Sequence, residues 1–156
     1  YGGDMIKEVT LEKSSWNAVP WKFEAGTPAI PEVIGLATAI QYLQKKGMDK
    51  IAAHDDELIQ YALKRLQSVP GVVIYGPAQR SGIISFNLAD VHSHDLATVL
   101  DEDNIAIRSG HHCCMPLMQI LSIGACARIS IALYSTKEDI DKFIKALHRS
   151  RKVFRL

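Results

Sequence analysis

The chain has 156 residues, 47% of them hydrophobic and 22% charged, and its formal net charge is +1. This composition is typical of a globular domain with a buried core and excludes a disordered chain. The near-zero charge argues against nucleic acid or a membrane surface as a partner, and no apolar run is long enough to cross a bilayer. Three cysteines do not make a disulfide framework and favour a reducing, cytoplasmic setting. The chain does not begin with methionine, which suggests a fragment or a processed chain, and its first residues match neither a signal peptide nor a transit peptide.

The first part of the chain predicts a strand, an ordered loop and two helices. Loose alternation of apolar residues predicts a strand over 5–11. Prolines, a glycine and aromatic side chains over 14–28 predict an ordered loop instead of a regular element. Apolar residues at helical spacing then predict one helix that ends at Gly47 and a second over 49–67.

The period of the pattern then changes to that of strands. Short apolar runs predict strands over 72–75 and 82–88, joined by a short polar loop as in a hairpin. The next helix is expected to begin at Ser93, which is a plausible N-cap. His92 and His94 are expected in surface or capping roles, because no matching Cys/His pair stands at zinc-site spacing.

The last part of the chain predicts two more strands, over 104–108 and 125–134, with one or two helical turns over 115–121 between them. A final helix opens with a capping box of Ser135 and Glu138. Strands and helices in this order predict an α+β fold, in which helices cover one side of a small, mainly antiparallel sheet.

Residues 108–118 carry the densest chemistry of the sequence, because a cation, a glycine, two imidazoles and two thiols follow one another there. A cysteine is a nucleophile only as a thiolate, and nearby positive groups lower its pKa. Glycine lets the backbone turn sharply beside it. The stretch therefore predicts a strand end that presents a reactive thiol. Arg128 lies inside an apolar strand and needs a partner to offset its burial, for which an anionic ligand is one candidate.

Four motifs stand in the order and spacing of a known family: Phe23–Pro28, Arg108–Cys113, Met115–Leu117 and Arg128–Ser130. Together they resemble the C-terminal part of a group II cysteine desulfurase, the SufS type. These are pyridoxal-phosphate (PLP) enzymes of class V of the aminotransferases. The resemblance runs from Gly2 to about Leu147. It implies the small C-terminal domain of the aspartate aminotransferase type fold over residues 29–156, with 1–28 as a strand and loop that reach toward the PLP site.

The resemblance also implies roles for seven residues. Cys113 would take sulfur from L-cysteine as a persulfide and release L-alanine, with Arg108, His111 and His112 favouring its thiolate. Arg128 would hold the substrate carboxylate, and Arg108 would assist in that pocket. Two further residues, Gly26 and Thr27, would contact the PLP phosphate of the neighbouring subunit. The implied partners are a sulfur acceptor of the SufE or SufU type, for iron–sulfur cluster assembly, and a second subunit in a homodimer.

The sequence departs from the family pattern in two ways. No lysine follows a Ser-His or Gly-His pair, so the residue that binds PLP covalently and the large domain that carries it are not in this chain. Lys22 stands in a segment unrelated to that role. We therefore expect no desulfuration by the chain alone. Cys114 stands where the family has a small residue without sulfur. Three interpretations are open: Cys114 competes with Cys113, it resolves the Cys113 persulfide as a disulfide, or it is a tolerated substitution.

Four alternatives stand beside the desulfurase interpretation. The chain could be a non-catalytic interaction or dimerisation domain, or part of a selenocysteine lyase or another class V aminotransferase. A structural alternative is an ion-paired arginine with an inert buried thiol, which the joint spacing of the motifs argues against. A metal site made by the consecutive residues 111–114 is disfavoured, because four successive side chains do not easily surround one tetrahedral ion.

Overall fold

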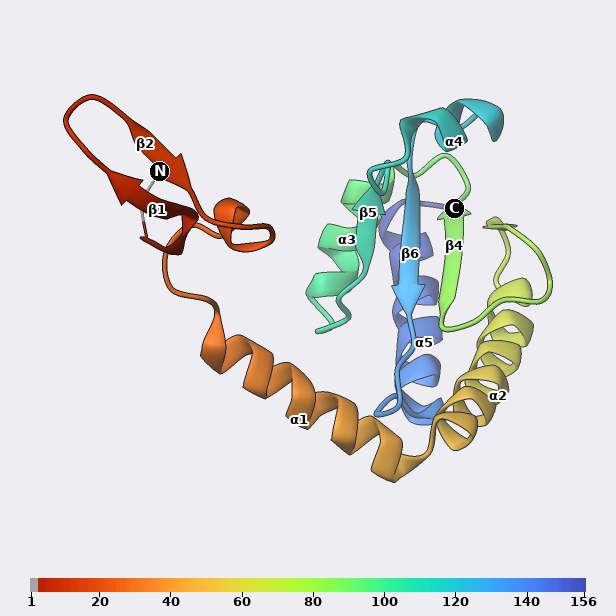
Figure 1. Ribbon diagram of the computed structural model, residues 1–156. Coiled ribbons are helices and arrows are strands. Elements are labelled where there is room, and N and C mark those ends of the chain that lie inside the picture. The colour runs from red at the N-terminus through yellow and green to blue at the C-terminus, as the bar shows by residue number, and fades with distance from the viewer. Residues whose placement is uncertain (1–2) are drawn as a thin grey trace. The chain divides into compact units, whose positions relative to one another are not determined.

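The structure is a computed structural model that describes residues 3–156 (Figure 1). Gly2, with which the family resemblance begins, lies outside the described residues. The chain divides into two compact units, Tyr1–Met48 and Asp49–Leu156. The division after residue 28 that the resemblance implies stays a prediction.

The first unit holds a two-stranded hairpin and one long helix. Its elements are η1 (Gly3–Met5), β1 (Ile6–Val9), β2 (Ser14–Trp16), η2 (Trp21–Phe23) and α1 (Ile30–Lys46). β1 confirms the first predicted strand, whereas the expectation of a loop over all of 14–28 is wrong. β2 lacks an alternating pattern and exists because it pairs antiparallel with β1, with Ile6 opposite Trp16. Gly47 ends α1 with φ +93°, a conformation that suits glycine, as predicted.

Burial in the first unit is slight. Met5 is the single buried hydrophobic residue among residues 3–48. α1 has no buried residue, and its apolar side chains Ile30, Val33, Ile34 and Ile40 are 46–63% exposed. Within the described part of the chain, no helix is both long and apolar enough to span a membrane. Within residues 3–48, no other element covers the apolar face of α1.

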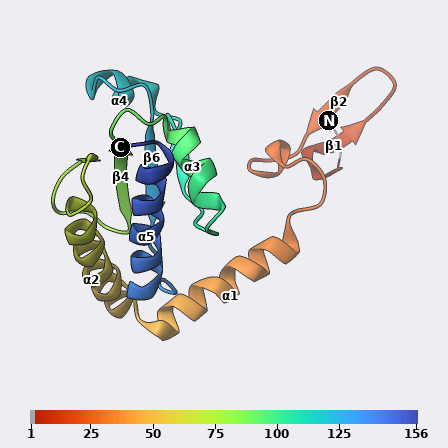
Figure 2. The same ribbon diagram turned by 180° about the vertical axis from the view of Figure 1, so that it is seen from behind.

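The second unit is the predicted α+β domain. Its elements are α2 (Met48–Gln67), β3 (Val72–Tyr75), β4 (Ile83–Leu88), α3 (Ser93–Asp101), β5 (Arg108–Gly110), α4 (Met115–Ile120), β6 (Cys126–Ser130) and α5 (Lys137–Val153). The strands form one sheet in the order β3-β4-β6-β5, and every neighbouring pair is antiparallel. Helices α2, α3 and α5 pack on one face of this sheet, and Figure 2 shows the sheet from the helix side. The predicted fold class is confirmed.

Alternation along the strands divides the sheet into a core face and an open face. Ile84 and Phe86 of β4 and Ile129 of β6 point to the helices and are buried. The ring of Phe86 meets that of Phe143 on α5 edge to face, with centroids 5.7 Å apart. The residues between them, which include Arg128, point to the other face, and no helix of the core cluster covers it.

Three boundaries differ from the sequence-based expectation. β5 begins at Arg108 and not at residue 104, because the preceding apolar residues pack against the core without forming a ladder. The capping box of α5 joins Thr136 and Asp139, one residue later than expected. His92 is the N-cap of α3, since its Nδ1 accepts from the His94 N–H at 3.3 Å, and this confirms its expected capping role. Ser93 is the first helical residue.

Candidate active site

Two arginines face each other on the open face of the sheet. Arg128 lies at the centre of β6, and the antiparallel register places Arg108 of β5 directly opposite it. On the other side of Arg128, Ser85 of β4 is its partner in the ladder. Opposite residues in such a ladder point to the same face, so the register alone places both arginine side chains on the open face.

The chain reverses immediately after β5. Gly110 has φ +116°, a conformation that residues with a side chain rarely adopt. His112 and Cys113 follow with φ +55° and +59°, and the Cys114 N–H donates to the His111 carbonyl oxygen at 2.9 Å. This turn leads into α4, which lies at the end of the sheet (Figure 1).

The turn presents the Cys113 thiol to solvent beside one of the arginines. Cys113 is exposed and free, and Arg108 Nη2 donates to its Sγ at 3.5 Å. Cys113, Arg108 and Gly110 line a pocket of 540 Å³ together with four histidines, His92, His94, His111 and His112. The strand end with an accessible thiol that the sequence predicts is therefore present, with a cation in contact with the sulfur.

Neither arginine is neutralised by an acid. Among residues 3–156, neither Arg108 nor Arg128 forms an ion pair with a carboxylate. Arg128 is half-buried, and its Nε is buried without a hydrogen-bond partner. Like charges that face each other across a ladder repel, and a bound anion would offset this repulsion between the two arginines. The structural alternative of an ion-paired arginine with a buried thiol is wrong.

His112 differs from the other imidazoles of the site. Its Nε2 lies 3.0 Å from the Cys126 carbonyl oxygen, and its Nδ1 is buried without a partner. Burial lowers the pKa of His112 below its ordinary value of 6.5, and the charges of Arg128, Arg108 and His111 lower it further. A lowered pKa disfavours the protonated form of His112, and the expectation that this residue favours the Cys113 thiolate stays a prediction.

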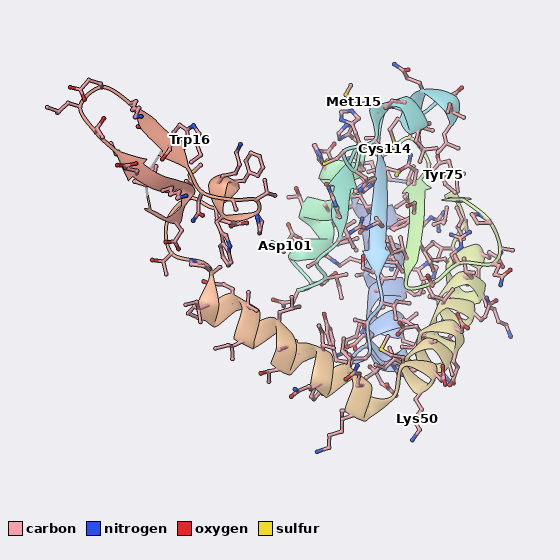
Figure 3. The ribbon with its side chains drawn as sticks, viewed as in Figure 1. Trp16, Lys50, Tyr75, Asp101, Cys114 and Met115 are labelled. Atoms are coloured by element: carbon pink, nitrogen blue, oxygen red, sulfur yellow. The ribbon has the colours of Figure 1, made fainter. Side chains whose placement is uncertain are left out.

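The other two cysteines line a second pocket. Cys114 and Cys126 border a pocket of 280 Å³ on the other side of His112, which Tyr75 and Arg128 also line. Cys114 is exposed at the end of the sheet that carries α4 (Figure 3), whereas Cys126 is buried, and burial raises the pKa of its thiol. Cys113 lines the first pocket and not the second, so the adjacent thiols of Cys113 and Cys114 open to different spaces.

The residues expected at a phosphate belong to the first unit. Gly26 has φ +78°, and a Cβ added to it would meet no atom within 4 Å. Thr27 is exposed, and its hydroxyl makes no hydrogen bond within residues 3–156. Backbone N–H groups in such a turn, with a free hydroxyl beside them, fit an anionic group. In the described part of the chain, no cluster of three His, Cys, Asp or Glu side chains could hold a metal ion.

Comparisons with known proteins point to one family. The family model described as aminotransferase class-V matches residues 1–143. A protein of Halalkalibacterium halodurans named probable cysteine desulfurase is 52% identical over 154 residues, which are 99% of this chain and 38% of that protein. The chain thus spans about two fifths of the length of the curated relatives it matches.

Two solved cysteine desulfurases have the same fold. The apo structure from Thermococcus onnurineus NA1 superposes with a TM-score of 0.85 at 35% identity, covering 97% of this chain and 38% of that one. The enzyme from Escherichia coli superposes with a TM-score of 0.87 at 34% identity, covering 98% and 38%.

Proposed function

The chain belongs to the class-V aminotransferase family, and from this premise we propose that it is the C-terminal part of a PLP-dependent cysteine desulfurase. The observation that carries the proposal is the pair Arg108 and Arg128, which has no acidic partner within residues 3–156, and of which Arg108 contacts the exposed thiol of Cys113. Such a site is suited to an anionic substrate and to a nucleophilic sulfur. L-Cysteine offers a carboxylate that the arginines can bind and a sulfur atom that the Cys113 thiol can attack.

Arg128 binds the substrate carboxylate in this proposal. A guanidinium group matches a carboxylate with two parallel hydrogen bonds, and the unpartnered Nε of Arg128 is one free donor. The carboxylate also removes the repulsion between Arg128 and Arg108 across the ladder. The second arginine is then free to remain in contact with the Cys113 sulfur.

Cys113 accepts the sulfur. Its thiolate attacks the sulfur of the bound cysteine, so that an S–S bond forms while the Cβ–S bond of the substrate breaks. The electron pair of the broken bond takes up a proton at Cβ, which yields alanine, and the sulfur stays on Cys113 as a persulfide. When bound, PLP supplies the electron sink that lets the Cβ–S bond break.

The residues present fit PLP in part. Gly26 and Thr27 would hold its phosphate, because their turn is open and the hydroxyl is free. No lysine of this sequence follows a histidine, as the family motif requires, so the covalent attachment would come from outside these residues. We therefore propose that these 156 residues alone do not turn over cysteine.

The finer assignment is to the SufS type, which the short Arg108–Cys113 motif supports. Within that assignment, the acceptor of the persulfide is a protein of the SufE or SufU type, and the sulfur serves iron–sulfur cluster assembly. The complete enzyme is then a cytoplasmic homodimer. A selenocysteine lyase would use the same residues, and comparing turnover of cysteine and selenocysteine distinguishes the two activities.

One observation favours a second candidate, a non-catalytic interaction or dimerisation domain. The apolar residues of α1, such as Val33 and Ile34, are exposed along a helix that has no buried residue. An uncovered apolar face of this kind is typical of an association surface. This candidate requires association without any chemistry at Cys113.

The test is to look for a persulfide on Cys113 by mass spectrometry. The chain is incubated with PLP and L-cysteine, once alone and once with the N-terminal part of the Halalkalibacterium halodurans relative, whose association with the chain is measured separately. We expect a persulfide only when that part is added. Cys113→Ser should remove it and the matched variant Cys114→Ser should keep it. Association without a persulfide would overturn the catalytic proposal and favour the interaction domain.

A further inference from the structure

The turn that carries the thiol has an unfavourable backbone. His112 and Cys113 are consecutive residues with side chains in the left-handed region, at φ +55° and +59°. Each such residue is strained and persists only where surrounding contacts hold it. Neither residue is glycine, which adopts this conformation without steric cost, and cysteine is not among the side-chain types enriched in it. Some contact must therefore hold the turn in place.

Few contacts of the turn reach beyond it. The hydrogen bond from the Cys114 N–H to the His111 carbonyl is local to the turn. The hydrogen bond from Arg108 to the Cys113 sulfur is long, at 3.5 Å, and sulfur is a weak acceptor. The Cys114 carbonyl oxygen accepts from the N–H groups of Leu117 and Met118 in α4, at 3.2 and 3.3 Å. Among the described residues, the side-chain hydrogen bond from the His112 imidazole to the Cys126 carbonyl oxygen, at 3.0 Å, joins the turn to the first residue of β6. It is the bond that ties the turn to the frame of the sheet.

The chemistry of this bond determines the state of the ring. A carbonyl oxygen can only accept, so His112 Nε2 carries the proton and donates it. Nδ1 is then a bare acceptor, buried and without a partner. A second proton on the ring would add a cation close to Arg128 and Arg108, both of which oppose it. The ring therefore serves as a neutral donor at a fixed position.

We infer that His112 is a positioning residue, which anchors the turn to β6 and thereby holds the Cys113 thiol in contact with Arg108. Its imidazole also forms a wall shared by the pocket of Cys113 and the pocket of Cys114. The inference rests on the proposed function for its purpose, since a held thiol matters to sulfur transfer. The geometry that it describes is independent of that purpose.

The test measures how fast iodoacetamide alkylates Cys113, resolved by peptide mass spectrometry, in a background that carries Cys114→Ser. His112→Leu removes the donor, whereas His112→Gln keeps an N–H donor at similar reach. The matched control is His54→Leu, because His54 Nε2 lies 3.1 Å from the Ser135 carbonyl oxygen, away from both pockets. Thermal unfolding of each variant is measured in parallel.

We expect His112→Leu to slow alkylation of Cys113 about tenfold, because the sulfur loses its hydrogen bond with Arg108. His112→Gln should restore the rate to within about twofold, and His54→Leu should lower the melting temperature without changing the rate. If His112→Leu does not fold, His112→Asn replaces it, since its amide is one methylene too short to reach Cys126.

An unchanged rate in His112→Leu, an equal loss of rate in His54→Leu, or no recovery in His112→Gln would each overturn the inference. The assay needs neither PLP nor cysteine. If the chain never forms a persulfide, the proposed function is contradicted, but the alkylation rates still test the role of His112.

Discussion

The two faces of the sheet in residues 49–156 share one backbone and have opposite compositions. Phe86 and Ile129 point to the helices and are buried, whereas their chain neighbours Ser85 and Arg128 point to the open face. Along each strand, the residues that face the helices therefore stabilise the core, and the alternate residues are available for the site. Substitutions one residue apart should therefore change different properties of this domain, either its stability or the chemistry of its site.

The largest expected effect is on the core face. Phe86→Ala removes a fully buried ring that meets Phe143, and we expect it to lower the free energy of unfolding by about 3–5 kcal/mol. Ile83→Ala on the same strand but the open face, where Ile83 is 44% exposed, should cost less than about 1 kcal/mol. Urea unfolding followed by circular dichroism measures both. Equal losses would show that the two faces do not differ in this way.

A smaller effect on the free energy of unfolding is expected from substitutions of two arginines of the domain. Arg80 donates to the carbonyl oxygens of Pro77, Tyr75 and Gly76, so Arg80→Met should lower the free energy of unfolding by about 2 kcal/mol. Arg128→Met removes an unpaired charge that faces Arg108, and should raise it by about 0.2–1 kcal/mol. The same unfolding curves compare the two variants. A clear loss of stability in Arg128→Met would mean that this arginine is a structural residue.

The smallest expected effect is a pH dependence. The pKa of His112 in the folded chain lies below 6.5, so the unfolded chain takes up a proton first as the pH falls through that value. The stability that depends on the neutral ring is present above pH 6.5 and is lost below it. His112→Gln should therefore lose less stability than the wild type between about pH 7 and pH 5. Parallel acid titration of the free energy of unfolding decides this, and identical profiles would contradict it.

The alternation of apolar residues along the last strand was enough to predict one part of the site, the position of Arg128. Alternation along 125–134 and the charge of Arg128 were enough to expect an anion-binding position on an otherwise apolar strand. The position of Arg108 opposite Arg128 could not be predicted from the strand period, because the register of β5 on β6 is set by pairing between segments that are far apart in the sequence. The same reason explains why β2, which has no pattern of its own, was missed.

Local signals failed where two solutions were nearly equal. Ser135 with Glu138 and Thr136 with Asp139 both satisfy the spacing of a capping box, and only the path of the chain into α5 selects the second. The left-handed turn at His112 and Cys113 carries only a weak local signal, because histidine is enriched in this conformation whereas cysteine is not. The one cue was a second histidine before the cysteine, whose role depends on the carbonyl of Cys126.

The strand that carries Arg108 is also the edge of the sheet. β5 has three residues, follows Ile107 directly and ends at Gly110, so it offers little backbone for a further strand to pair with. Short, charged edge strands are a means by which proteins avoid edge-to-edge aggregation. The brevity of β5 therefore protects the domain from self-association through its sheet, in the same three residues that bring an arginine to the thiol. Extending this strand with alternating apolar residues would endanger solubility before it affected the chemistry.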